Sequence, residues 1–341
     1  MRVLSTLLLT ALLGLAAEAG ASEPADVPEP GAYLAVKNES SDLFVARNYK
    51  ALDARMEQYV TRKTRTASGR WVSGPFFEGI LYGTGRPEAA HDASVAWWDL
   101  LEKRVQGWAK DRPDSALARL TLAQVIVNRA WHIRGSGYAS TVPASAWKPF
   151  REHLSRAQRY LDSESRVASR YPEYYTLKLF VAKGLGDDRK IVDAIFEEGT
   201  QRFPGYDPLY FSMVDYLLPK WHGDADQVEA FARDAVMRSR RTEGQGMYAR
   251  IYWAASQSQF EDALFRESGV HWKQMRDGFE DVTKRYPDQW NLQNYAHFAC
   301  QAGDLKTLRK LLPRIERPVL ADAWSGRMSF EACGRLAASK D

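Results

Sequence analysis

The 341-residue chain has only two cysteines, Cys300 and Cys333, and after its first 17 residues no hydrophobic run approaches the length needed to cross a membrane. Its charge is nearly balanced, since 47 Lys and Arg residues face 43 Asp and Glu residues, a net charge of +4. Such a mild excess does not indicate a nucleic-acid partner. A composition that is 45% hydrophobic, with 11 Trp, excludes collagen-like and disordered proteins.

The local motifs of metal binding and catalysis are missing as well. The six histidines form no His-x-x-x-His pair and no His-Glu-x-x-His motif, so we expect no metal and no cofactor. The glycine-rich residues 83–86 lack the Gly-Lys-Ser/Thr of a phosphate-binding loop, and there is no Gly-x-Ser-x-Gly nucleophile elbow. Only a site assembled from residues far apart in the sequence is left open.

The N-terminus has the features of an export signal. Arg2 precedes a nearly unbroken apolar run, Val3 to Ala17, and a small-residue cleavage site follows at Ala19-Gly20-Ala21. The run is shorter than the roughly 20 residues of a membrane span. We therefore predict a signal peptide over residues 1–21 and a periplasmic or secreted protein without membrane insertion after cleavage; the alternative is an uncleaved anchor. Residues 22–39 begin with a Pro- and acid-rich stretch and are predicted to be a flexible leader.

Two cysteines in an oxidising compartment favour a disulfide between Cys300 and Cys333. Closing that loop is worth roughly 3–4 kcal/mol in the chain-entropy model. Two buried thiols on helix faces are the alternative, because unpaired Cys is among the most buried residue types.

Three segments share one layout, in which an Arg-aromatic-Pro triplet precedes an apolar helical pattern that ends in a Gly-Asp turn. Proline is suited to the first turn of a helix, glycine ends one in a left-handed conformation, and aspartate caps the next. Apolar residues recur every three or four positions and never alternate over a long stretch, which predicts helices and no strands. The triplets are Arg170-Tyr171-Pro172, Arg202-Phe203-Pro204 and Arg285-Tyr286-Pro287, and the turns are Gly186-Asp187, Gly223-Asp224 and Gly303-Asp304.

A helix predicted after Pro113 is apolar on two faces, one with Leu120 and Val127 and the other with Leu122 and Ile126. Such a helix is sandwiched between neighbours, as in a stack. Further helices are predicted over residues 40–65, 91–110, 243–257 and 270–286, and residues 66–86 read as a packed loop with a short helix. We predict an all-α array of helical hairpins (an α-solenoid) over residues 91–341, preceded by an N-terminal helical segment over 40–90.

The repeat pattern resembles degenerate tetratricopeptide-type repeats. Three strings, at residues 131–137 (WHIRGSG), 217–223 (LLPKWHG) and 248–253 (YARIYW), are similar to an exported bacterial family known as domain of unknown function 4034, over roughly residues 40–338. The resemblance implies a helical fold and export. It implies no activity, cofactor or catalytic residue.

Two constellations are candidate sites. Trp221, His222 and Asp224 stand at a predicted helix end, where a histidine beside a carboxylate can act as a general base; the structural alternative is a turn and helix cap. Trp131 and Arg134, with His132, precede a long connection over residues 135–147 that contains Tyr138. An arginine among aromatic side chains suits a peptide, sugar or carboxylate ligand, and the alternative is an ordinary crossover.

A third group consists of Arg238, Arg240 and Arg241, followed by Tyr248, Arg250 and Trp253. Basic residues interleaved with aromatic ones can bind nucleic acids or anionic polymers. A solvated helix end, where arginines oppose the helix dipole, explains the arginines equally simply and is the interpretation we adopt.

Two functions follow as hypotheses. In the first, the chain binds a protein or an extended peptide without catalysis, because stacked hairpins create binding surfaces. In the second, it is a cell-envelope hydrolase in which His222 works with Asp224 or Asp226. A deep pocket that joins His222, Arg134 and a buried carboxylate would favour the second. The candidate binding residues are Trp131, Arg134, Tyr138, Trp221, His222, Arg250 and Trp253.

Overall fold

The computed structural model describes residues 29–83, 95–324, 326 and 328–339. Within these residues the chain is helical, and the only β-type pairing is an isolated bridge between Arg65 and Trp71. The prediction of an all-α fold is confirmed. None of the described helices combines the length and apolar character of a membrane span. The predicted signal peptide, residues 1–21, lies outside the described residues.

The chain begins with three helices, α1 (Glu29–Val45), α2 (Tyr49–Arg62) and α3 (Ser73–Gly79). The α-helices that follow are α4 (Val95–Asp111), α5 (Ala116–Arg134), α6 (Ala144–Ser163), α7 (Ser165–Ala168), α8 (Glu173–Leu185), α9 (Arg189–Arg202), α10 (Asp207–Leu217), α11 (Ala225–Glu243), α12 (Gly246–Ala255), α13 (Leu264–Glu267), α14 (Trp272–Arg285), α15 (Gln289–Gln301), α16 (Leu305–Leu311) and α17 (Phe330–Ala338). Short 3-10 or π-type turns are η1 (Ala139–Thr141), η2 (Ser256–Phe260), η3 (Glu261–Ala263), η4 (Leu312–Arg314) and η5 (Ala321–Trp324).

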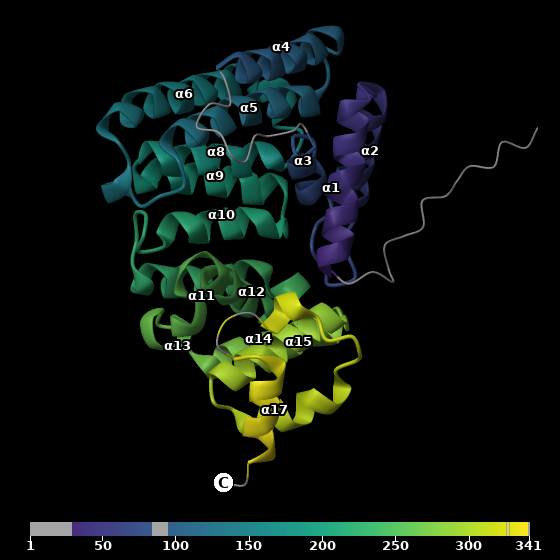
Figure 1. The fold of residues 1–341 in the computed structure, drawn as a ribbon, viewed down its shortest axis with the longest axis vertical. Coiled ribbons are helices and arrows are strands. Elements are labelled where there is room, and N and C mark those ends of the chain that lie inside the picture. The colour runs from purple at the N-terminus through teal and green to yellow at the C-terminus, as the bar shows by residue number, and fades with distance from the viewer. Residues whose placement is uncertain (1–28, 84–94, 325, 327, 340–341) are drawn as a thin grey trace, which may run out of the picture.

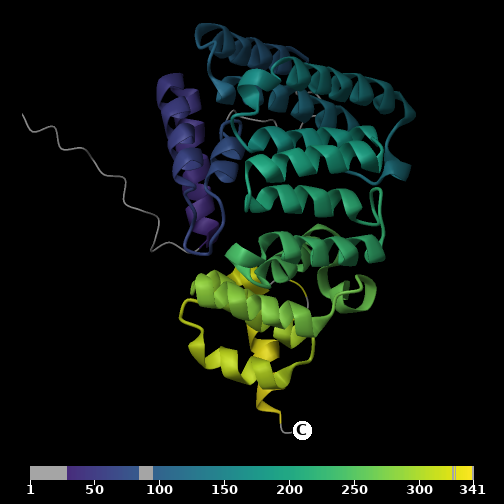
Figure 2. The ribbon, with the colours of Figure 1, turned by 180° about the vertical axis from the view of Figure 1, so that it is seen from behind.

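From α4 onward, consecutive helices lie on one another like rungs, as Figures 1 and 2 show from opposite sides. Helix α5 is the clearest case, because it packs against α4, α6 and α8 at once. Leu120 and Val127 on one face and Leu122 and Ile126 on the other are all buried. The apolar residues on two faces of α5 are therefore explained by its contacts with helices on both sides.

Helix ends follow the predicted turn chemistry in part. Gly186 ends α8 with a left-handed φ of +75°, and Asp224 and Asp304 cap α11 and α16 by accepting backbone N–H bonds. Pro204, however, does not begin a helix. It lies in the turn before α10, whose first turn contains Pro208 instead.

The prediction of a flexible leader over residues 22–39 is wrong for residues 29–39, which form the first part of α1. The helix is held by one buried stripe, Ala32, Val36 and Phe44, and packs on α2 and α3. The approach to α3 is very close, because a Cβ added to Gly79 would lie 2.4 Å from the Cα of Lys37. Packing against neighbouring helices thus overrides a local composition typical of a linker.

Helices α1 and α2 run along the side of the stack, across the direction of its rungs (Figure 1). The loop after α2, residues 64–72, joins them to rungs that are far away in the sequence. The Ser68 carbonyl accepts hydrogen bonds from Arg250 Nη2 (2.8 Å) and Asn291 Nδ2 (3.0 Å). The Gly205 carbonyl likewise accepts from the Trp71 indole (2.9 Å). We call residues 64–72 the brace loop.

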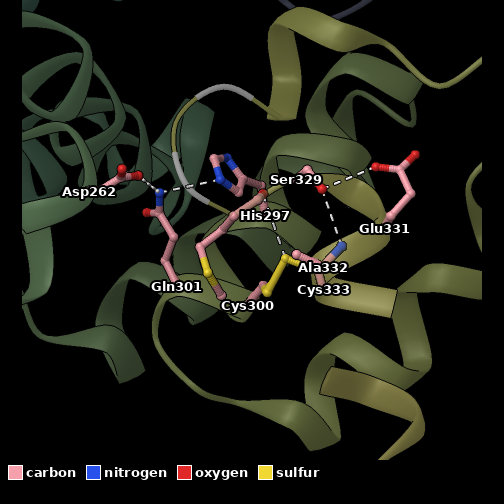
Figure 3. Close-up of a disulfide and its surroundings, with 9 residues drawn as sticks. Asp262, His297, Cys300, Gln301, Ser329, Glu331, Ala332 and Cys333 are labelled. Atoms are coloured by element: carbon pink, nitrogen blue, oxygen red, sulfur yellow. Dashed lines mark hydrogen bonds between the residues drawn. A yellow bond between two sulfur atoms is a disulfide. The ribbon is translucent and has the colours of Figure 1, made fainter. Parts of the chain in front are cut away.

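Cys300 on α15 and Cys333 on α17 form a disulfide (Figure 3). Cys333 is fully buried, and the bond fastens the last described helix to the end of the stack. His297, one turn before Cys300, is buried beside the Trp324 ring and lies 3.3 Å from Gln301 Nε2. The polar side chains at this end therefore sit in a mostly apolar environment.

Replacing both cysteines by alanine should lower the free energy of unfolding by roughly 3–4 kcal/mol, because the unfolded chain regains the entropy of an open loop. Urea unfolding of the oxidised wild type, the reduced wild type and the double variant measures this. Equal midpoints in all three would contradict a stabilising disulfide. Thiol labelling of the denatured, unreduced protein should find no reactive thiol.

The stability of the protein should also depend on His297 below pH 6.5. Burial lowers the pKa of His297 to about 4. Between pH 6.5 and pH 4 the histidine is therefore protonated in the unfolded state but neutral in the folded state. The resulting loss is absent above pH 6.5 and grows as the pH falls toward 4, to about 2–3 kcal/mol. His297→Gln should remove this part of the pH dependence in unfolding experiments at pH 7 and pH 4.5. Parallel pH profiles for both proteins would show the prediction to be wrong.

Candidate functional site

A pocket of about 830 Å³ lies where the ends of several helices and their loops meet. These helix ends are at the edge of the stack opposite α1 and α2 (Figure 1). This volume is within the usual range for small-molecule pockets. Its walls come from the C-terminal ends of α5 and α8, the start of α6, the α10–α11 loop and η2–η3. The lining residues are Trp131, Arg134 to Ala139, Trp147, Phe150, Arg151, Lys183 to Gly186, Lys220 to His222, Ser258, Gln259 and Glu261.

Aromatic rings form the inner wall of the pocket. Trp131 makes edge-to-face contacts with Phe150 (centroids 5.0 Å apart) and Trp221 (5.8 Å). Helix α8 can reach Trp131 because residue 184 is a glycine. A Cβ on Gly184 would lie 2.6 Å from Leu154 Cδ1 and 3.3 Å from the Trp131 ring.

Arg134 lies among these rings at the end of α5 and is only 8% exposed. Its guanidinium carbon is 5.3 Å from the Trp131 ring centroid, 5.5 Å from that of Trp147 and 5.9 Å from that of Trp221. Burial lowers the pKa of Arg134. Three aromatic faces therefore share one desolvated cation, an arrangement stabilised by cation–π attraction.

Arg134 also closes the end of its own helix. Its Nη1 donates to the Gly135 carbonyl (3.0 Å) and the Gly137 carbonyl (2.9 Å). A cation is favourable at a helix C-terminus, so this capping role explains why an arginine stands here. The capping role does not supply a negative charge, however. Among the described residues, no carboxylate forms an ion pair with Arg134.

Lys183, at the end of α8, is a second buried cation beside the same rings. Its Nζ is 4.5 Å from the Trp221 ring centroid, and it forms an ion pair with Asp215 of α10. Burial lowers the pKa of Lys183, and the Asp215 carboxylate opposes this effect. Unlike Arg134, Lys183 therefore has its own counter-ion.

The outer rim of the pocket is formed where the α10–α11 loop meets η2. The Lys220 backbone N–H donates to Gln259 Oε1 (3.0 Å), and Lys220 Nζ donates to the Ser258 carbonyl. The π-type turn η2 is followed by Glu261, a non-glycine residue with φ of +44°. Backbone strain and π-turns of this kind are enriched at functional sites.

His222 lines the pocket but has no catalytic partner among the described residues. Its Nε2 donates to the Lys183 carbonyl (2.8 Å), and because a carbonyl can only accept, this nitrogen carries the proton. The Asp224 carboxylate accepts from the Gln227 backbone N–H (2.8 Å) as the cap of α11. Asp226 is exposed on the first turn of the same helix. The arrangement expected for a histidine–carboxylate pair is not formed.

The pocket brings together two of the three predicted constellations. Five of the predicted residues lie in its lining, namely Trp131, Arg134, Tyr138, Trp221 and His222. The other two do not join them. Arg250 is buried and binds the brace loop, and Trp253 packs against Phe279 and Trp290; both line a separate cavity of about 260 Å³.

The structure adds pocket residues that the sequence patterns did not indicate. Trp147 was expected in the long connection, but that connection ends at Pro143 and Trp147 lies on α6. Lys183 comes just before a Gly-Asp turn, and its importance depends on Asp215, 32 residues later. An unusual concentration of Trp on successive helix ends is the one sequence signal that could have indicated this wall.

No group of three or more His, Cys, Asp or Glu side chains within the described part of the chain is placed to hold a metal ion. Residues 38–152 match the model of a family described as a domain of unknown function, DUF4034. No curated protein and no solved structure matches the chain. The matched region includes the Trp131, Arg134 and Trp147 side of the pocket, and the Lys183 and Trp221 side lies beyond it.

The Lys183–Asp215 pair should be essential to the pocket wall. Asp215→Asn leaves a buried ammonium without a counter-ion and should lower the free energy of unfolding by about 2–3 kcal/mol. The matched control is Asp193→Asn, which breaks an exposed pair with Arg189 on α9 and should cost less than about 0.5 kcal/mol. Both are measured by urea unfolding at pH 7. Equal losses in the two variants would mean that the Lys183 pair is no stronger than a surface pair.

Proposed function

This chain belongs to the DUF4034 family through residues 38–152, and we propose that it is an exported, non-catalytic binding module that takes a protein or an extended peptide into the pocket between α5, α6 and α8. The observation that carries the proposal is the composition of that pocket. Three tryptophans and two buried cations, Arg134 and Lys183, meet in one cavity of about 830 Å³. Tryptophan and arginine are the residues that contribute most to recognition at binding sites.

The construction of the pocket also supports a binding role. Its wall is fixed by ring contacts, by the close approach at Gly184 and by the Lys183–Asp215 pair, so little ordering is needed when a ligand enters. Tyr138 is 80% exposed at the mouth, where it can contact a segment that continues out of the pocket. Tyrosine is among the residue types enriched at the energetically dominant positions of binding sites.

Two features support export. The first is the apolar run Val3 to Ala17 followed by small residues, which has the layout of a secretory signal. The second is the Cys300–Cys333 disulfide, because such bonds persist in oxidising compartments and are rare in the cytosol.

The hydrolase alternative finds no comparable support. His222 donates to a backbone carbonyl, and the carboxylate of Asp224 is engaged in capping α11. Because general-base catalysis needs a positioned partner, no observation favours it over binding.

Purified full chain should bind random-sequence peptides, measured by the change in tryptophan fluorescence and by calorimetry. Trp221→Ala should weaken binding about tenfold or more, since it removes an aromatic wall. Tyr138→Ala should weaken it severalfold without affecting stability, because this side chain is exposed. Met237→Ala, on the exposed face of α11 outside the pocket, is the matched control and should bind as the wild type does.

Thermal unfolding of each variant separates loss of binding from loss of fold. Peptide binding that survives in both pocket variants would place the binding site elsewhere. A chain that binds no peptide would contradict the proposed function. Peptides recovered in cleaved form would favour the hydrolase instead.

A further inference from the structure

Several buried hydrogen-bond donors around Arg134 have no acceptor among the described residues. Only Nη1 of its guanidinium donates to protein acceptors within the described residues, although the side chain is more than nine-tenths buried. The indole N–H groups of Trp131 and Trp221 are also buried there without an acceptor among the described residues. Donors buried without acceptors cost free energy, which a ligand rich in acceptors can recover.

The charges in the lining also favour a ligand rich in hydrogen-bond acceptors. Four cationic side chains, Arg134, Arg151, Lys183 and Lys220, face one carboxylate in the lining, Glu261. Asp215 neutralises Lys183, and no comparable partner neutralises Arg134 within the described part of the chain. The cavity therefore favours an anion over a cation of similar size.

The placement of the cations argues against a sugar as the main ligand. Sugars bind to exposed faces of aromatic rings, whereas Arg134 and Lys183 occupy positions over the Trp131 and Trp221 rings at 4.5–5.9 Å. The same cations repel an ammonium ligand, which would otherwise suit an aromatic cage. The group available for ligand binding is therefore the Arg134 guanidinium, which the aromatic rings hold in place.

The helix ends decide between two kinds of anion. Helices α5 and α8 present their C-terminal ends to the pocket, and these carry a partial negative charge. This field opposes any anion, but it opposes a phosphate group, with nearly two negative charges, more than a carboxylate with one, and phosphate sites are typically built on helix N-termini instead. A carboxylate carries a single delocalised charge and matches the planar fork of one arginine.

We infer that the ligand's anchoring group is a peptide carboxylate, bound by Arg134 in the ring of Trp131, Trp147 and Trp221. This inference rests on the proposed function, since it names the chemical group by which a peptide is held. The remainder of the peptide leaves the pocket past Tyr138. The carboxylate can be the C-terminus of the peptide or an Asp or Glu side chain, and the experiment separates these sources.

The test uses four random-sequence peptide pools with acetylated N-termini: with a free or an amidated C-terminus, and with or without Asp and Glu. Binding of the purified full chain to each pool is measured by calorimetry. The pool that contains both carboxylate sources should bind about tenfold or more tightly than the pool that lacks both, because hydrogen bonds to charged groups are strong. The source that matters is the one whose removal alone produces this loss.

Arg134→Gln should abolish the difference between acidic and neutral pools, and Arg134→Lys should keep part of it through its charge alone. Since each ratio is taken within one variant, a modest loss of stability does not affect the result. Arg159→Gln, on an exposed part of α6 outside the pocket lining, is the matched control and should keep the full difference. Preference for acid should also weaken at high ionic strength.

Three outcomes would overturn the inference. If the neutral pool binds as well as the acidic pools and Trp221→Ala abolishes that binding, the proposed function stands and the carboxylate anchor is wrong. If inorganic phosphate displaces the bound peptides more effectively than acetate does, the pocket binds a phosphate group and not a carboxylate. If no pool binds, the proposed function falls together with the inference.

Discussion

A helix that is apolar on two faces has to be covered on both, and this constraint organises the chain from α4 to its C-terminal end. Helix α5 satisfies it by lying between α4, α6 and α8, and the aromatic side chains of later helices extend the same packing along the stack. The helices of the stack end along its two edges (Figure 1). The pocket lies at such an edge, where Trp131, Lys183 and Trp221 come from three different helix ends.

The stack is not a simple array in which each unit touches only its neighbours. Two backbone carbonyls, those of Ser68 and Gly205, receive side-chain donors that connect the brace loop with α12, α15 and the α9–α10 turn. Gly69 is a glycine for a visible reason, since its φ is +88° and a Cβ would lie 2.6 Å from the Tyr286 ring. The first helices are therefore attached along several rungs rather than to the adjacent one.

Local patterns predicted what depends on local physics. The spacing of apolar residues predicts the helix around Leu120, the Arg-aromatic-Pro triplet predicts the one after Pro172, and Gly186 and Asp304 are predicted helix boundaries. The first half of α1 was missed because Pro30 and Gly31 resemble a linker, and its one buried stripe is short.

The candidate site divides in the same manner. Trp131, Arg134 and Trp221 were singled out as unusual residues at helix ends, but their meeting in one pocket depends on how the rungs stack, which no local pattern encodes. Arg250 and Trp253 looked equally suitable by residue type, and long-range packing gave them a different role. Lys183 is significant because it pairs with Asp215. The local sequence around either residue does not indicate this pair.

The brace loop has a consequence for the order in which the molecule can be completed. A ribosome releases residues 64–72 long before Arg250 and Asn291 exist, so the Ser68 carbonyl stays in water during most of synthesis. Its burial becomes favourable only when donors from α12 and α15 arrive, because a carbonyl buried alone is costly. The brace loop can therefore reach its final hydrogen bonding only after α12 and α15 have formed.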